Sequence, residues 1–393
     1  MKSLNYLFIL LAIWVLPLTL SAQSISIAHG PYLQNLDERE VTIMWLSNKP
    51  SIGWVELAPD DSTSFYLCER PKFFDSVNGV KNISEIHSVK IKNLTPGTSY
   101  RYRIFSQEIL KYEGTDVVYG KVASTNVFRK APLKFTTNDR NKVTTSFIMV
   151  NDIHGRAGDI SKLLKASNYK TKDMVFFNGD MLSKVPNRDT IFSGFMDESI
   201  HLFAAEKPMY YARGNHETRG IFAVSFQELF SAKVPNLYYM FRQGPVCFIV
   251  LDTGEDKPDS DIEYSGITDY DNYRSEQAEW LAKAVLSEEF KTASYKVVIA
   301  HMPPLTQQKD MWHGAREVMC KFVPILNNAG VDVMLCGHLH KVLYQPASEN
   351  IKFPVWVNSF NTVMEGEVKN GKLQIKLLDI NGQTLDEHQF PDK

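Results

Sequence analysis

Met174-Val-Phe-Phe-Asn-Gly-Asp180 is the stretch that decides the fold, because four apolar residues run directly into Asn-Gly-Asp. Such a run is typical of a buried strand that ends in a tight turn. The glycine permits the turn and leaves Asp180 as a carboxylate at the carboxyl end of a strand. In open α/β sheets this edge is where ligands bind. Gly-Asp alone is a common dipeptide, and a turn with a capping aspartate would account for it equally well.

Four other apolar runs also end in side chains that can bind a metal ion. They lead into Asp152 and His154, into Asn215 and His216, into His301, and into His338 and His340. Residues two apart in a strand point to the same side, so the Asp-x-His and His-x-His pairs would each aim two ligands into one space. A hydrogen-bonded core residue accounts for any single histidine, but not for five such segments together. We therefore expect a two-metal site bridged by Asp180.

Composition and charge restrict the class of protein. A chain of 393 residues is long enough for about two or three domains, and its 44% hydrophobic and 22% charged residues are ordinary for a globular protein. The formal net charge is -2, so no global basic field would attract nucleic acid. We expect no nucleic-acid partner.

Residues 1–22 have the pattern of an export signal. A short positive start is followed by an apolar run from Leu4 to Leu20 and then by small residues. The alternative is a single membrane anchor, which Pro17 and the lack of a basic flank after Gln23 disfavour. We predict cleavage of this signal peptide, no stable membrane insertion afterwards, and an exported protein that is periplasmic, on the cell surface or secreted.

The four cysteines are scattered rather than paired at metal-binding spacing. Cys247 and Cys336 lie in apolar runs and are predicted to be small buried residues. Export would permit a disulfide, and the spacing leaves its formation open.

Residues 24–137 are predicted to be all-β. Val41–Trp45 and Tyr100–Ile104 alternate with period two, as half-buried strands do, and turn signals separate such runs at short intervals. Several short strands without a helical period indicate a β-sandwich. Leu94–Tyr100 resembles the tyrosine-corner segment of fibronectin type III domains. No His/Asp cluster falls in this region, so we expect it to support the chemistry rather than carry it.

Residues 143–393 follow a polar break at 138–141 and are predicted to form an α/β domain, because strands alternate with helices. Three helices are expected: one capped by Asp159 that ends at Ala166, one from a capping Ser275 to Leu286, and one from Arg316 to Leu326. The acidic segment 255–273 is interpreted as a solvated loop, with a substrate lid as the alternative.

The motifs of this second region resemble those of the calcineurin-like metallophosphoesterase superfamily. The matching residues are Asp152-x-His154, Gly179-Asp180, Gly214-Asn-His-Glu217, His301 and Gly337-His-x-His340. The strand-rich region before them resembles the N-terminal domain of purple acid phosphatases. The resemblance implies a fibronectin type III-like sandwich followed by two facing sheets flanked by helices.

The resemblance also implies a role for each residue. One metal would be bound by Asp152, His154, Asp180 and His340, and the other by Asp180, Asn215, His301 and His338. His216 would face a small phosphorylated substrate as a charge stabiliser or proton donor. Asn215 would lie beside the same substrate, and His313 would take the place of an outer substrate-binding histidine.

Two bound cations suit phosphoester hydrolysis on physical grounds. At about 3.5–4 Å apart they can clamp the attacking and leaving oxygens, and a bound water that ionises near pH 7 supplies a hydroxide nucleophile. Mixed His, Asp and Asn ligands suit two divalent metal ions and leave zinc, manganese and iron open.

The chain departs from purple acid phosphatases at two positions. Those enzymes carry a tyrosine where this chain has Ser183, and a residue other than histidine where it has His154. A neutral imidazole thus replaces an anionic phenolate, which favours divalent metals over iron(III). With Asp152, Asp180 and a hydroxide, two divalent metals leave a formal charge of about +1, which a phosphodiester would neutralise.

These observations predict an exported two-metal phosphomonoesterase of the acid phosphatase type. One alternative is a phosphodiesterase or nucleotidase that uses the same site. The other is a surface binding protein with a vestigial metal site, which the complete ligand set disfavours.

Overall fold

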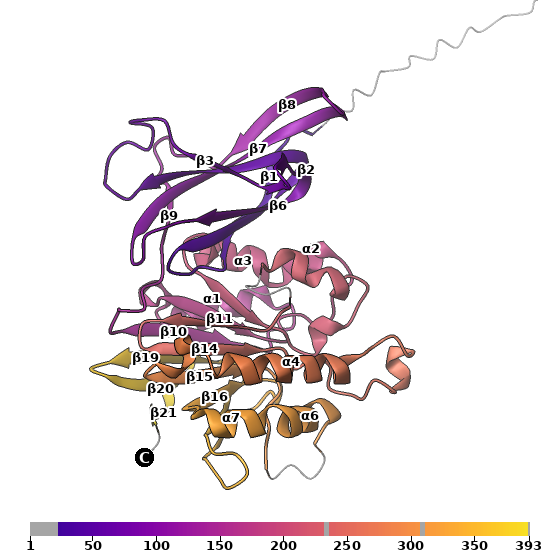
Figure 1. Cartoon of the computed structure of the whole chain (residues 1–393), viewed down its shortest axis with the longest axis vertical. Helices are drawn as coiled ribbons and strands as arrows, with labels where there is room; N and C mark the ends of the chain where they lie inside the picture. The colour runs from indigo at the N-terminus through magenta and orange to yellow at the C-terminus, as the bar shows by residue number, and fades with distance from the viewer. Residues whose placement is uncertain (1–22, 232–235, 307–310, 392–393) are drawn as a thin grey trace, which may run out of the picture.

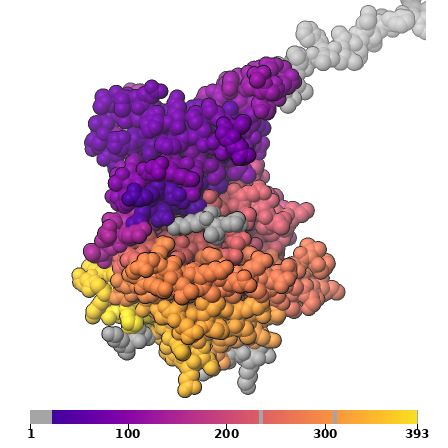
Figure 2. Space-filling view, in the orientation of Figure 1, coloured from indigo at the N-terminus to yellow at the C-terminus, as the bar shows by residue number. Residues whose placement is uncertain are grey.

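The computed structural model describes residues 23–231, 236–306 and 311–391. The predicted signal peptide, residues 1–22, lies outside the described residues. A strand-rich N-terminal region is stacked on an α/β domain, and the two are in broad contact (Figure 1, Figure 2). Within the described ranges, no helix combines the length and the apolar character needed to cross a membrane.

The N-terminal region is a seven-stranded sheet built on the long strand β2 (Glu40–Pro59). The first half of β2 pairs with β1 (Ile27–Gln34) and β6 (Ile83–Lys92), and its second half pairs with β7 (Ser99–Glu113). The other strands are β3 (Lys72–Phe74), β8 (Asp116–Ser124) and β9 (Leu133–Thr136), with β4 (Ser76–Val77) and β5 (Val80–Lys81) as a separate pair. The all-β texture expected for this region is thus present.

Strand β2 is buried on both faces at residues 41–46, where the sequence predicts half-buried alternation. Val41, Ile43 and Trp45 pack inside the N-terminal region, whereas Met44 and Leu46 pack against residues of the α/β domain. The prediction was wrong because the face expected to meet water is covered by the α/β domain. The two regions therefore share a hydrophobic core.

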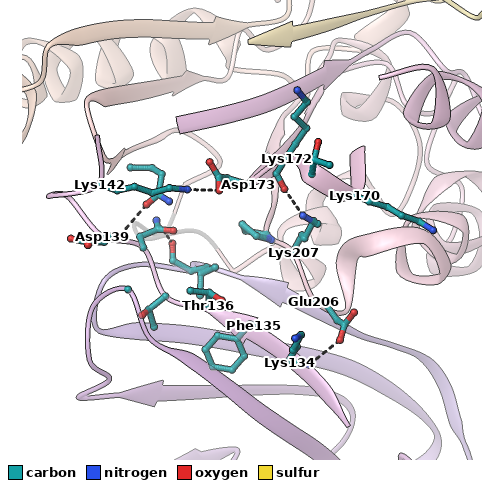
Figure 3. Close-up of a pocket in the computed structure, with 17 residues that line it drawn as sticks. Lys134, Phe135, Thr136, Asp139, Lys142, Lys170, Lys172, Asp173, Glu206 and Lys207 are labelled. Carbon is teal, nitrogen blue, oxygen red and sulfur yellow. Dashed lines mark hydrogen bonds and ion pairs between the residues drawn. The ribbon is translucent and has the colours of Figure 1, made fainter. Parts of the chain in front are cut away.

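The polar break at 138–141 is not a loose linker. Asn138 is buried, and its Nδ2 donates to the carbonyl oxygen of Leu36 at 3.0 Å. Beside it lies a cavity of about 560 Å³ between the two regions (Figure 3). Several lysines line this cavity, and two of them are engaged: Lys142 pairs with Asp173 at 2.6 Å, and Lys207 donates to a backbone carbonyl. No predicted metal ligand lines the cavity.

The α/β domain contains two six-stranded sheets. The first has the order β12-β11-β10-β19-β20-β21 and the second β13-β14-β15-β16-β18-β17. The strands of the first are β10 (Thr145–Val150), β11 (Met174–Asn178), β12 (Met209–Ala212), β19 (Thr362–Lys369), β20 (Lys372–Asp379) and β21 (Thr384–Phe390). Those of the second are β13 (Tyr239–Gln243), β14 (Val246–Leu251), β15 (Tyr295–Ala300), β16 (Val333–Cys336), β17 (Leu343–Gln345) and β18 (Val355–Val357).

A buried cluster that includes Phe147, Phe176 and Phe248 fills the space between these sheets. The outer face of the first sheet is covered by α1 (Ala157–Ala166) and by a helical segment made of α2 (Arg188–Ile191), η2 (Phe192–Met196), α3 (Asp197–Ser199) and η3 (Ile200–Ala204). The outer face of the second is covered by α4 (Tyr270–Ala284), α5 (Glu288–Lys291), α6 (His313–Lys321) and α7 (Val323–Ala329). The predicted α/β domain of facing sheets flanked by helices is confirmed.

Two of the expected helices, α1 and α4, are present and begin earlier than predicted, whereas α1 ends at Ala166 as predicted. Asp159 lies in the first turn of α1 rather than at its cap. The helix expected from Ser275 begins earlier, because the carboxylate of Asp259 accepts the N–H groups of Tyr270 and Asp271, each at 2.9 Å. That cap comes from outside the helix, so local sequence does not reveal it.

The helix expected over residues 316–326 is two helices that meet at Phe322. Pro324 has no N–H to donate and is favoured in a first turn, so it starts α7 instead of continuing α6. The cysteine predictions are confirmed for Cys247 and Cys336, which are buried, and no disulfide joins any of the four cysteines, all of which lie in the described ranges.

Candidate metal centre

The loops that follow five strands carry the predicted ligands. β10, β11 and β12 are parallel in the first sheet, and β15 and β16 are parallel in the second. Their carboxyl ends therefore lie at one edge within each sheet. The loops contribute, in chain order, Asp152 and His154, Asp180, Asn215, His301, and His338 and His340.

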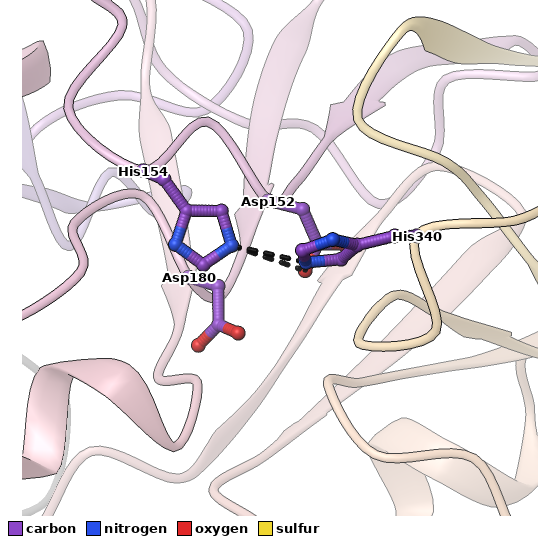
Figure 4. Close-up of side chains that lie close together, drawn as sticks. All are labelled: Asp152, His154, Asp180 and His340. Carbon is purple, nitrogen blue, oxygen red and sulfur yellow. Dashed lines mark hydrogen bonds and ion pairs between the residues drawn. The ribbon is translucent and has the colours of Figure 1, made fainter.

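Two groups of side chains offer ligand atoms that lie within 4.8 Å of one another, and Asp180 belongs to both groups. The first consists of Asp152, His154, Asp180 and His340 (Figure 4), and the second of Asp180, His301 and His338. The side-chain oxygen of Asn215 lies 3.1 Å from Nδ1 of His338, which adds an amide oxygen to the second group. The predicted ligands thus come together as two sets that share one carboxylate.

In the first group, the rings of His154 and His340 point toward each other beside Asp180 (Figure 4). Their Nε2 atoms are 3.0 Å apart, and Nε2 of His340 is 3.2 Å from Oδ1 of Asp152. Burial lowers the pKa of His154, whereas the adjacent carboxylate of Asp152 raises the pKa of His340. Three lone-pair atoms at this spacing can face one common cation.

In the second group, the ring of His301 is oriented by strand β11. Its Nδ1 lies 2.7 Å from the carbonyl oxygen of Asn178, and because a carbonyl only accepts, Nδ1 carries the proton. Nε2 then faces Oδ2 of Asp180 at 3.1 Å. Burial by itself would lower the pKa of His301, but the charge of Asp180 outweighs burial and raises it to about 10. A proton on this nitrogen lies where a cation would bind, so metal binding would displace it.

Two buried atoms of the site have no hydrogen-bond partner of acceptable geometry among the described residues. They are Oδ1 of Asp152 and Nε2 of His301. Buried polar atoms are otherwise almost always satisfied. Carboxylate, imidazole and amide donors together suit divalent transition metals. The residues present therefore fit two metal ions.

Five of the ligands have a left-handed backbone. The φ angle is +56° at Asp152, +50° at His154, +54° at Asp180, +73° at His338 and +53° at His340. Side chains with a Cβ are strained in this region by about 1 kcal/mol or more, and such strain clusters at functional sites. The expected strand geometry for the two ligand pairs is wrong, because β10 and β16 end before them. Turns, not strand pleat, aim these side chains.

Two glycines allow the ligand loops to approach one another. A Cβ at Gly179 would lie 2.4 Å from Nδ1 of His301, and a Cβ at Gly214 would lie 2.3 Å from Oδ1 of Asp180. No neighbour could tolerate such contacts without moving a ligand. The glycines that precede Asp180 and Asn215 therefore contribute to the site, because the absence of a side chain lets the ligands come together.

Glu217 is a residue of the site for which the sequence analysis predicted no role. Its Oε2 accepts the backbone N–H groups of Asp180 at 2.9 Å and Gly214 at 3.0 Å, and its Oε1 accepts that of Leu182 at 2.9 Å. Burial and the charge of Asp180 raise the pKa of Glu217 to about 7. Its side chain joins the loop after β11 to the loop after β12. Its place in Gly-Asn-His-Glu was the available sequence signal.

His216 lies at the site without belonging to either ligand group, at the start of η4 (His216–Thr218). Its Nδ1 is 2.8 Å from the carbonyl oxygen of Ser183 and so donates to it. The ring stands perpendicular to that of His154, with centroids 4.8 Å apart, and Nε2 is 3.9 Å from Oδ2 of Asp180. Nε2 of His216 therefore faces the ligand groups.

The structure does not bring His313 into either ligand group. Its Nε2 is 2.8 Å from Oδ1 of Asp271, in a separate cluster that also contains Glu317. Arg274 pairs with Asp271 at 2.6 Å, and Lys321 pairs with Glu317. This cluster is a salt-bridge network whose carboxylates already have cationic partners.

The acidic segment 255–273 is anchored to the loop that carries His216. Glu255 is buried and accepts the hydroxyl of Thr218 at 2.7 Å and the guanidinium of Arg219 at 2.6 Å. The interpretation as a solvated loop is therefore wrong for Glu255. The sequence could not reveal this, because the partners come from a distant part of the chain.

Comparison with known proteins agrees with the geometry of the site. The family model described as calcineurin-like phosphoesterase matches residues 145–342, half of the 393-residue chain, and that range contains every predicted ligand. Purple acid phosphatase 18 of Arabidopsis thaliana is 29% identical over 154 residues, which cover 36% of this chain and 32% of that protein. Purple acid phosphatase 22 of the same plant is 25% identical over 287 residues, which cover 70% of this chain and 55% of that protein.

The chain thus spans from a third to about half of the length of these relatives. Among solved structures, the crystal structure of a dimetal phosphatase from Danio rerio aligns with a TM-score of 0.45 and 12% identity. The alignment covers 62% of this chain and 98% of that one.

Proposed function

The chain belongs to the calcineurin-like phosphoesterases, which are phosphoric ester hydrolases, and we propose that it is an exported phosphomonoesterase of the acid phosphatase type with two divalent metal ions. The observation that carries this proposal is the place of Asp180 in both ligand groups. One carboxylate shared by two sets of donors is the arrangement that two adjacent cations require. Zinc, manganese and iron all suit these donors.

Each ligand has a proposed assignment. The first metal is held by Asp152, His154, Asp180 and His340, and the second by Asp180, Asn215, His301 and His338. Metal ions held there would supply Lewis-acid charge for the hydrolysis of a phosphoester. A substrate anion would enter a site whose own carboxylates, Asp152 and Asp180, are neutralised by the bound cations.

His216 is the proposed catalytic residue. The hydrogen bond from its Nδ1 to Ser183 holds the ring so that Nε2 faces the site. From there a protonated Nε2 can stabilise charge on the phosphoryl group or give its proton to the leaving oxygen. Asn215 lies next to it and would contact the same substrate, and His313 would act from farther out, through Asp271.

A phosphodiesterase is the second candidate, and the neutral ring of His154 favours it. His154 adds no negative charge, so the two metals, two carboxylates and a hydroxide leave about +1, which a phosphodiester monoanion balances. A phosphomonoester dianion would depend more on His216 being protonated.

The organisation of the chain is part of the proposal. Residues 1–22 would be a cleaved signal peptide that exports the protein, residues 24–137 a fibronectin type III-like sandwich, and residues 143–393 the catalytic domain. The hydroxyl of Tyr100 accepts the N–H of Thr95 at 3.0 Å, which supports a tyrosine corner in the sandwich.

Turnover of a chromogenic phosphomonoester and a chromogenic phosphodiester tests the proposal. Each is measured with metal-free protein and after addition of zinc, manganese or iron(II). We expect metal-dependent hydrolysis with the monoester preferred. Faster diester turnover would select the second candidate, and no turnover of either ester with any metal would leave the proposal untenable.

A further inference from the structure

Phe360 is an exposed aromatic residue at the rim of the metal centre. It lies in the turn between β18 and β19, and 37% of its surface is exposed. Its ring meets the ring of His340 edge-on, with centroids 5.9 Å apart. The side chain of His340 is itself 48% exposed, so the ligand group opens to solvent beside this ring.

Arg156 covers the ring of Phe360 from another direction. Its guanidinium carbon lies 5.4 Å from the centroid of the ring. Arg156 is held in place, because it donates to Oδ2 of Asp159 at 3.1 Å and to the carbonyl oxygen of Asp152 at 2.9 Å. Phe360 is thus supported by a cation and by a ligand ring, and the remainder of its surface faces water.

The turn that carries Phe360 is tied to both ligand loops. Oγ of Ser359 donates to the carbonyl oxygen of His340 at 3.0 Å. Nδ2 of Asn358 donates to Oδ1 of Asn151, next to Asp152, at 2.6 Å. A ring fixed in this way loses little conformational freedom when it contacts a ligand. A large apolar side chain held rigidly at a polar site, instead of packed in the core, is in the position of a binding surface.

We propose that Phe360 forms a subsite for the leaving group of the substrate, and that the chain prefers phosphomonoesters of aromatic alcohols. This inference rests on the proposed function and adds the substrate class. With the phosphoryl group at the ligands, an aryl group that extends past His340 meets the ring of Phe360. Two aromatic rings gain about 0.5–1.5 kcal/mol beyond the burial of their area, which a saturated ring of similar size does not gain.

Phenylphosphonate and cyclohexylphosphonate are the probes, because they have similar size and are not hydrolysed. Their affinities for metal-loaded protein are measured by titration calorimetry. We expect the wild type to bind phenylphosphonate more tightly. Phe360→Leu keeps an apolar side chain but removes the ring, so it should weaken phenylphosphonate about two- to twelvefold and cyclohexylphosphonate less than about twofold. Phe360→Tyr should retain the preference.

Phe128→Leu is the matched control, because Phe128 is 72% exposed and lies in the N-terminal region, outside both ligand groups. It should leave both affinities unchanged. Equal affinities in the wild type, equal losses in Phe360→Leu, or no binding of either phosphonate would overturn the subsite. The chromogenic assay separates this from failure of the proposed function. If wild type and Phe360→Leu both hydrolyse the chromogenic phosphomonoester while the phosphonates show no aryl preference, the subsite is overturned and the phosphomonoesterase stands.

Discussion

The carboxylate of Glu217 accepts the backbone N–H of Asp180 at 2.9 Å, so a buried acid that belongs to neither ligand group holds the residue shared by both. The same side chain accepts the N–H of Gly214, two residues from His216. Two loops from neighbouring strands are thus fixed to each other by one side chain. The position of the shared ligand depends on a residue outside both ligand groups.

Glu217→Gln tests this dependence. A glutamine keeps one acceptor oxygen and places an NH2 group against N–H donors, so buried donors lose their partner. We expect the free energy of unfolding to fall by about 2–4 kcal/mol, together with the metal content per chain. Chemical denaturation and elemental analysis measure the two effects. Glu228→Gln, at an exposed position, should change neither. Unchanged stability in Glu217→Gln would show that these hydrogen bonds contribute little.

Asp180→Asn removes a negative charge that two cations would share. Both metals should weaken together, so the metal content should fall well below two per chain and turnover by orders of magnitude. Asp189→Asn changes an exposed carboxylate in the same way and should retain metals and turnover. Full metal occupancy with normal turnover in Asp180→Asn would show that Asp180 is not the shared metal ligand.

His216→Ala should separate metal binding from proton transfer. We expect both metals to remain, while kcat falls more for esters with basic leaving oxygens, because those depend most on a proton donor. His201→Ala, at an exposed histidine, is the control. Equal losses across leaving groups would leave only charge stabilisation, and loss of a metal would make His216 a ligand.

His87 should make folding stability depend on pH. It is buried beside Ser51, whose Oγ is 2.8 Å from its Nε2, and burial lowers its pKa from 6.5 to about 4. The unfolded chain therefore binds the proton more readily, so the contribution is complete above pH 6.5 and declines as the pH falls from 6.5 toward 4. Between pH 7 and 4.5 the decline should be about 2–3 kcal/mol.

The measurement for His87 is the unfolding free energy of the wild type minus that of His87→Gln at each pH, because other groups titrate in the same range. This difference should shrink on acidification. The same comparison with His201→Gln, at an exposed histidine, should be flat. A flat difference for His87→Gln as well would mean that the buried ring accepts a proton without cost.

The protein should be colourless or pale when loaded with iron, zinc or manganese. The purple of the related phosphatases comes from a tyrosinate on iron(III), and Ser183 stands in its place, with Oγ 3.4 Å from Nδ1 of His154. Tyr273 of the acidic segment donates its hydroxyl to Asp252 instead of joining a ligand group. Visible spectra and activity under reducing conditions test this. An intense band lost on reduction, together with activity, would contradict it.

The sequence predicted the α/β domain and the residues of the site because strand ends carry both signals at once. An apolar run such as residues 174–177 marks a buried strand, and a polar ligand directly after it marks the edge where strands end. These are local patterns, so no contact between distant residues was needed to find them.

The remaining features depend on contacts between distant parts of the chain. Asp259 sets the start of α4 from outside the helix, and Arg219 buries Glu255 across a long sequence separation. Met44 is buried because the other region covers it. In the sequence Glu217 cannot be distinguished from other charged residues. Only the structure shows the three backbone N–H groups that its carboxylate accepts.

The left-handed backbone of five ligands bears on which residues these positions favour. At such φ angles glycine is unstrained, whereas aspartate and histidine are strained. Replacement by glycine would thus relax the metal-free backbone while it removes a ligand, so backbone preference and metal binding favour different residues at these positions. Each of these five positions carries a side chain that its turn alone would not favour, so the chain holds its ligands at a cost in backbone energy.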